Sequence, residues 1–126
     1  MGSNSNSGAN AGLILKIRKK DHHEREKRVI KVGNVPVKSR EQIEGIRESG
    51  KINTMVLDFV EEHIKAGIST QEIDDWVRKV TADNGAICAP YHYEGFPKSV
   101  CTSVNSVICH GIPSKDEILK EGDIIN

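Results

Sequence analysis

The side chains best suited to chemistry gather in the stretch from Tyr93 to Pro113. Histidine is the usual side chain for proton transfer near neutral pH, and His110 ends a β-rich run just before a Gly-Ile-Pro loop. A histidine at a strand end, bordered by aromatic and thiol side chains, is compatible with a residue that lines a small apolar pocket. The same spacing also suits a structural histidine with two buried thiols, and nothing fixes Cys101 and Cys109 as metal ligands. From spacing alone, both interpretations stand.

Other catalytic signatures are missing from the sequence. It contains no H-E-x-x-H zinc motif, no G-x-S-x-G nucleophile elbow, no Walker loop and no G-x-G-x-x-G dinucleotide loop. The pair His22-His23 lies in a charged run without a third convergent ligand, which favours a surface pair over a metal site. His63 falls near the end of a predicted helix, where an imidazolium complements the helix dipole. Neither position therefore predicts a site.

Two amphipathic helices precede the Tyr93–Pro113 stretch and must position it. Each begins with a capping box, in which a serine and, three residues later, a glutamine or glutamate satisfy free N–H groups of the first turn. The boxes start at Ser39 and Ser69, and apolar residues at three- or four-residue spacing predict helices over 39–66 and 69–83. Gly67 supplies the permissive backbone expected of a C-terminal cap.

Short β-rich runs surround the two helices. Upstream, 13–17 and 29–32 are expected to pair across a charged loop, and downstream Asn105-Ser106 predicts a tight hairpin between the runs on either side of it. The downstream runs are 86–89, 99–104, 107–110 and 122–125. This order of elements predicts an α+β fold with two helices packed on an antiparallel sheet.

The N-terminal segment and the rest of the chain differ in net charge, although the 18 Lys and Arg of the whole chain balance its 18 Asp and Glu. Residues 1–34 carry eight basic and three acidic side chains, whereas the remaining 92 residues carry ten and fifteen. We therefore expect a flexible leader over 1–12, a basic charged arm over 13–34 and a body over 35–126. A basic arm suits an anionic surface such as the ribosome, but a solvated charged segment is the usual explanation of such a run. No RNP, KH or C2H2 signature supports nucleic-acid recognition.

Composition indicates a globular protein outside the membrane. No run approaches the ~18 apolar residues of a membrane span, and the N-terminus lacks a hydrophobic signal core. Three cysteines without a C-x-x-C pair do not make a disulfide framework. We expect a soluble, cytoplasmic protein with no membrane partner.

The Tyr93–Pro113 region closely resembles the signature of type I methionine aminopeptidases. The resemblance rests on GFPKSVCTSVNSVICHGIP followed by LKEGDIIN, and on REQIEGIRESGKI and GISTQEID upstream. It covers residues 35–126 and implies the N-terminal half of a pita-bread (creatinase/aminopeptidase-like) fold, in which two α+β halves enclose a dinuclear metal site. It also implies hydrolytic removal of the initiator methionine from nascent polypeptides, whose N-termini would be the substrates.

The resemblance implies roles for individual side chains. By motif position, His110 matches the histidine that contacts substrate and helps to stabilise the tetrahedral intermediate. Tyr93, Phe96 and Cys101 match positions that line the pocket for the methionine side chain. Pro90 also falls at a pocket position, where some relatives carry cysteine. A thioether between aromatic rings gains roughly 0.3–1.5 kcal/mol from sulfur–aromatic contacts.

The resemblance further implies two divalent metal ions, of Co, Mn, Fe, Zn or Ni, in the complete enzyme. The family holds them with two Asp, one His and two Glu, and the first of these Asp would fall just beyond Asn126. We therefore expect no metal ligand within this chain, no metal bound by it alone, and no peptide hydrolysis by it alone. Asp123 belongs to a turn and is not expected to be a ligand.

The isolated chain would expose a strand edge and an apolar face that a second half would cover. We therefore expect it to self-associate or to associate with a complementary half. Two alternatives to an enzyme segment remain. One is a non-catalytic pita-bread relative that acts as a binding module, against which the pocket residues argue. The other is a truncated or engineered chain with no function of its own, which the leader favours.

Overall fold

The computed structural model describes residues 15–17 and 30–126. The predicted leader (1–12) and most of the predicted arm (13–34) lie outside these described residues, so both stay predictions. Within the described part, no helix is long and apolar enough to cross a membrane.

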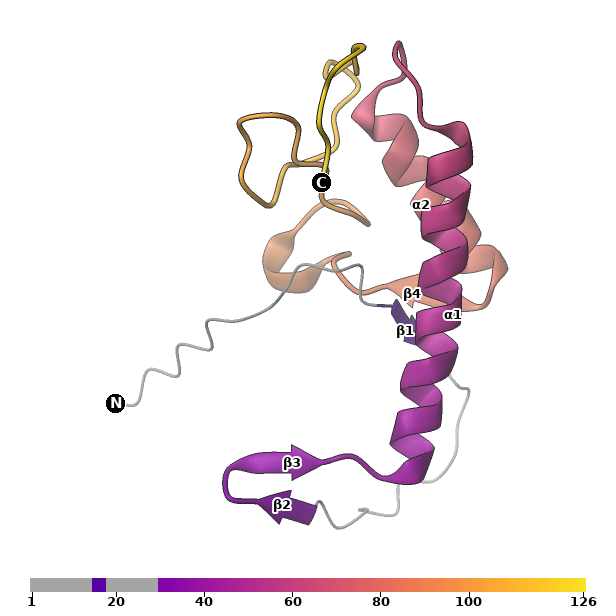
Figure 1. The fold of residues 1–126 in the computed structure, drawn as a ribbon, viewed down its shortest axis with the longest axis vertical. Helices are drawn as coiled ribbons and strands as arrows, with labels where there is room; N and C mark the ends of the chain where they lie inside the picture. The colour runs from indigo at the N-terminus through magenta and orange to yellow at the C-terminus, as the bar shows by residue number, and fades with distance from the viewer. Residues whose placement is uncertain (1–14, 18–29) are drawn as a thin grey trace.

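Two packed helices and a small antiparallel sheet form the body of the structure (Figure 1). Helix α1 (Arg40–His63) packs against α2 (Thr70–Asp83), and strand β4 (Ala86–Cys88) follows α2. Strand β4 pairs antiparallel with β1 (Leu15–Ile17). These elements confirm the predicted α+β class.

Both helices begin where their capping boxes predict. The Ser39 hydroxyl accepts from the Gln42 N–H at 3.2 Å, and Gln42 Oε1 accepts from the Ser39 N–H at 2.8 Å. Ser69 and Glu72 make the same two bonds at 3.3 and 2.8 Å. Each box satisfies N–H groups that have no partner within the first helical turn.

Helix α1 ends earlier than residue 66, and Gly67 is not its cap. The C-cap is Ile64, whose backbone is extended, and Gly67 lies in the following loop with a φ of +93°. The Gly67 N–H donates to the Leu119 carbonyl at 2.8 Å, and the Leu119 N–H donates to the Ile68 carbonyl at 2.9 Å. The chain leaves the helix early because this loop pairs with a segment far along the sequence.

The core lies between the helices and the segments that follow them. Trp76 packs against this core and meets Phe59 edge-on at 6.3 Å between ring centroids. The exposed His63 stacks on Phe59 at 4.0 Å. His63 Nδ1 also lies 2.7 Å from the Phe59 carbonyl oxygen, which makes His63 a structural side chain. The buried apolar residues of the core are Val56, Ile68, Ile73, Val77, Cys88, Val104 and Leu119.

The predicted pairing of 13–17 with 29–32 is wrong. Strand β1 pairs with β4, and β2 (Ile30–Val32) pairs with β3 (Val35–Val37). The two-residue turn Gly33-Asn34 makes this local hairpin possible, because Gly33 adopts a φ of +61°. The hairpin lies at the N-terminal end of α1, apart from the rest of the body (Figure 1).

The predicted hairpin between 99–104 and 107–110 is also wrong, although its turn exists. The Val107 N–H donates to the Val104 carbonyl at 3.1 Å, and Asn105 has a φ of +52°. The strand-like partner of this segment is instead the C-terminal end, where Val104 bridges Ile125. Asn105 holds this segment against the C-terminal end: its N–H donates to the Ile124 carbonyl at 2.8 Å, and its Oδ1 accepts from the Ile124 N–H at 3.1 Å.

We expect Ser69→Ala to lower the free energy of unfolding by about 1 kcal/mol, because it removes the N-cap of a helix whose first turn is buried. Ser39→Ala is the matched control, since it removes the same cap at the exposed start of α1 and should cost less. Urea denaturation followed by Trp76 fluorescence measures both. Equal losses would contradict a special role for the start of α2.

Candidate functional site

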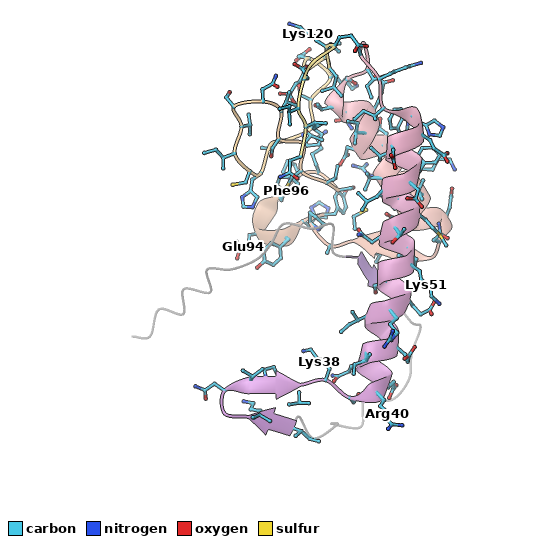
Figure 2. The ribbon with its side chains drawn as sticks, viewed as in Figure 1. Lys38, Arg40, Lys51, Glu94, Phe96 and Lys120 are labelled. Atoms are coloured by element: carbon cyan, nitrogen blue, oxygen red, sulfur yellow. The ribbon has the colours of Figure 1, made fainter. Side chains whose placement is uncertain are left out.

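The predicted pocket residues lie on the segments that follow β4. Tyr93 opens a short 3-10 turn, η1 (Tyr93–Gly95), and Phe96 follows it directly. Tyr93 is 67% exposed, Phe96 and Cys101 are half-buried, and His110 is exposed. Figure 2 shows Phe96 at this turn, beside the C-terminal segments. The candidate site is therefore an open surface rather than an enclosed cavity.

The backbone of this region is unusually strained. Left-handed backbone costs a non-glycine residue about 1–3 kcal/mol and clusters at functional sites. In η1, the Phe96 N–H donates to the Tyr93 carbonyl at 2.9 Å, which fixes the two aromatic residues relative to each other. The positive-φ non-glycine residues of the described chain all lie in this region: His92, Glu94, Asn105 and His110.

Gly111 brings the His110 segment against the Cys101 segment. The Thr102 N–H donates to the Gly111 carbonyl at 2.8 Å, and the Gly111 N–H donates to Ser103 Oγ at 3.2 Å. A Cβ atom at position 111 would fall on the Thr102 carbonyl, 2.6 Å from its carbon. Only glycine therefore permits this approach, a role that sequence reasoning missed.

The structure does not bring all four predicted site residues into contact. Cys101 and His110 are neighbours of the bonded pair Thr102 and Gly111, so their segments lie side by side. In the part of the chain that the structure describes, no side-chain hydrogen bond or ring contact joins Tyr93 or Phe96 to His110. The aromatic pair and the histidine thus lie on separate segments of the described chain.

Cys101 suits an apolar wall better than a nucleophile. Partial burial raises the pKa of its thiol, and the neighbouring Cys109 raises that pKa further. A thiol with a raised pKa stays protonated and unreactive at neutral pH. Cys101 therefore offers a soft, uncharged surface at neutral pH.

Asp123 is a turn residue, as predicted. Its Oδ1 accepts from Asn105 Nδ2 at 2.8 Å, and its Oδ2 accepts from the Lys120 N–H at 2.8 Å. These bonds lower the pKa of Asp123 below its ordinary value of 3.8. Because the pKa is lowered, the stabilisation is present above that ordinary value and is lost as acid protonates the folded-state carboxylate.

Buried polar residues of α2 hold the segments around the site, and sequence reasoning missed them. Thr70 has no exposed surface; its Oγ1 accepts from the Ser114 N–H at 2.9 Å, and its own N–H donates to the Glu117 carbonyl at 2.9 Å. Asp74, also without exposed surface, accepts from the Ser99 N–H at 2.6 Å. Their i, i+4 spacing beside the apolar stripe of the helix was the available signal.

The described residues do not offer a metal site. Among residues 15–17 and 30–126, no three His, Cys, Asp or Glu side chains converge so that they could hold an ion.

Comparison with known proteins relates the sequence to peptidases. A model of metallopeptidase family M24 matches residues 44–126. The chain is 46% identical over 101 residues to methionine aminopeptidase 1 of Saccharomyces cerevisiae, covering 80% of this chain and 26% of the relative. It is 41% identical over 93 residues to the methionine aminopeptidase of Escherichia coli K12, covering 73% of this chain and 35% of the relative. The chain thus spans about a quarter to a third of the length of these curated relatives.

The fold is also similar to that of solved methionine aminopeptidase structures. The crystal structure of methionine aminopeptidase from Rickettsia prowazekii matches with a TM-score of 0.68 at 40% identity, over 71% of this chain and 36% of that chain. The enzyme from Thermotoga maritima matches with a TM-score of 0.68 at 30% identity, over 70% and 35%. The predicted fold is confirmed: the helices and small sheet match part of the pita-bread fold of these enzymes.

We expect Gly111→Ala to lower the free energy of unfolding by about 1–3 kcal/mol, because the added methyl group forces Thr102 and Gly111 apart. The NMR signals of His110 should shift at the same time. Gly50→Ala is the control: its added methyl group enters open space in α1, where alanine should stabilise by about 0.5–1 kcal/mol. A neutral Gly111→Ala would refute the proposed close approach.

Proposed function

Because the chain belongs to metallopeptidase family M24, with methionine aminopeptidases among its relatives, we propose that it contributes to removing the initiator methionine from nascent proteins. The observation that carries this proposal is the extent of the family match, which runs over residues 44–126 and so includes every predicted site residue. The chain spans only part of its relatives, so activity, substrate and partners are all part of the proposal.

In this proposal the chain supplies the wall that receives the methionine side chain. Phe96 is half-buried and so is fixed in place, while Tyr93 is exposed and free to close over a ligand. The protonated Cys101 thiol adds a soft contact for the thioether. Sulfur–aromatic contacts of roughly 0.3–1.5 kcal/mol each would favour methionine over an alkyl side chain of equal length. Pro90, which is half-buried, would help to shape the same pocket.

His110 is the proposed substrate-contacting residue. Its imidazole is exposed, and its backbone is held by the contact between Gly111 and Thr102. An N–H of the ring can donate to the carbonyl oxygen of the bound methionine, where negative charge develops during hydrolysis. The two divalent ions that the family implies (Co, Mn, Fe, Zn or Ni) do not fit the described residues, so we assign them no step here.

The remaining expectations concern partners and location. Nascent polypeptides that begin with methionine are the proposed substrates, and the cytoplasm is the proposed location. Contact with the ribosome through the basic arm (13–34) rests on charge alone. Association with a complementary half or with a second copy is proposed because the apolar face of the β2–β3 hairpin is exposed; its residues are Ile30, Val32, Val35 and Val37.

Titration of the chain with the peptide Met-Ala-Ser, followed by NMR, tests the proposal. We expect the signals of Phe96, Cys101 and His110 to shift, and Phe96→Ala to weaken binding by up to about tenfold through loss of a sulfur–aromatic contact. Leu57→Ala is the control, because it truncates an exposed side chain on α1. We expect no release of methionine by this chain even with added Mn²⁺. Absence of binding, or equal weakening by the two variants, would contradict the proposal.

A further inference from the structure

Asp74 is a buried carboxylate that the proposed chemistry does not use. A buried charge is costly unless hydrogen bonds and an opposite charge compensate it. Both of its oxygens are compensated: Oδ1 accepts from the Ser99 N–H at 2.6 Å and from the Val100 N–H at 3.3 Å, and Oδ2 accepts from Arg78 Nη2 at 2.9 Å. Asp74 therefore links Arg78 of its own helix to one short piece of backbone.

That piece of backbone joins two pocket residues. Ser99 and Val100 lie between Phe96 and Cys101. A carboxylate that binds their N–H groups therefore restrains the backbone that connects the two proposed pocket residues. Neighbouring side chains of α2 support the same segment. Arg78 Nε donates to Ser99 Oγ at 3.2 Å, and its guanidinium lies 5.3 Å from the centre of the Tyr91 ring; Lys98 Nζ donates to Gln71 Oε1.

A second ion pair on α2 shows that pairing alone does not explain Asp74. Asp83 pairs with Lys79 at the same four-residue spacing. The Asp83 side chain is 60% exposed, whereas that of Asp74 is fully buried. Asp83 thus has the same charge as Asp74 and a basic partner one helical turn away. It lacks the bonds that Asp74 makes to Ser99 and Val100.

We propose that Asp74 is a positioning residue: its carboxylate fixes the segment 98–100 so that Phe96 and Cys101 present one continuous wall to the methionine side chain. The inference rests on the proposed function for the identity of the ligand, but the contacts of Asp74 stand without it. Asparagine cannot replace aspartate here, because its amide group would turn an N–H toward either Arg78 or the loop N–H groups.

The three free thiols report on this segment. Cys101 lies next to it, Cys88 is buried in the core, and Cys109 is exposed. The test is the rate of alkylation of each thiol by iodoacetamide, measured by mass spectrometry on the whole chain. In Asp74→Asn we expect Cys101 to react about tenfold faster or more, because a hydrogen bond to a charged acceptor is lost. Its pH–rate profile should move to lower pH, since burial is the main cause of its raised pKa.

The alkylation rate of the buried Cys88 distinguishes local loosening of the segment from unfolding of the whole chain. Asp83→Asn is the matched control variant. The proposal requires an unchanged Cys88 rate in Asp74→Asn and rates equal to those of the unaltered chain in Asp83→Asn. Asp74→Glu keeps the charge but displaces the carboxylate, so Cys101 should accelerate there as well. An unchanged Cys101 rate in both Asp74 variants, or a Cys88 rate that rises in parallel with it, would overturn the proposal.

Protection of Cys101 by L-methionine tests the proposed ligand separately from the role of Asp74. If the wall binds a methionine side chain, L-methionine slows alkylation of Cys101 in the unaltered chain, and higher concentrations are needed in Asp74→Asn. If L-methionine gives no protection in the unaltered chain, the proposed ligand is wrong, while the alkylation rates still decide whether Asp74 fixes the segment.

Discussion

The structure depends on hydrogen bonds made by buried polar side chains at the start of α2. Thr70 binds the segment that contains Ser114 and Glu117, and Asp74 binds the segment that contains Ser99. Apolar packing joins α1 to α2, but these polar contacts decide where the irregular segments run. Unlike apolar contacts, hydrogen bonds have a preferred direction, so they hold loops that have no regular structure of their own.

The strained backbone of the site needs such support. His92 and Glu94 flank the start of η1, and His110 adopts the left-handed region just before Gly111. Each conformation is unfavourable by itself and persists when neighbouring contacts determine it. The His92 N–H donates to the Phe96 carbonyl at 3.0 Å, and the contact between Gly111 and Thr102 holds the backbone beside His110. Asp74 holds the segment between Phe96 and Cys101. These contacts give the exposed segments a defined backbone conformation, which the proposed wall for a methionine side chain would need.

The sequence predicts the helices well and the strand pairing poorly. Ser39 and Ser69 predict the starts of the two helices, because a capping box is formed by residues only three positions apart in the sequence. Strand partners depend on the whole fold, so the run at 99–104 has no local feature that favours Ile125 over the adjacent 107–110. For Asp74 the sequence offers only its i, i+4 spacing from Thr70 beside the apolar stripe of α2, and its partner Ser99 lies 25 residues further along the chain. The candidate site residues themselves came from resemblance to a family, and their spacing alone did not separate a pocket from a structural cluster.

Native-state hydrogen exchange of the whole chain tests most directly the claim that α2 holds the site. The account predicts that the N–H groups of Ser99 and Thr70 exchange as slowly as those in the middle of α2, because both residues are buried and both N–H groups are hydrogen-bonded. The N–H of Ile108, in the exposed turn beyond Asn105, should exchange much faster. Exchange of Ser99 at the rate of Ile108 would contradict the account.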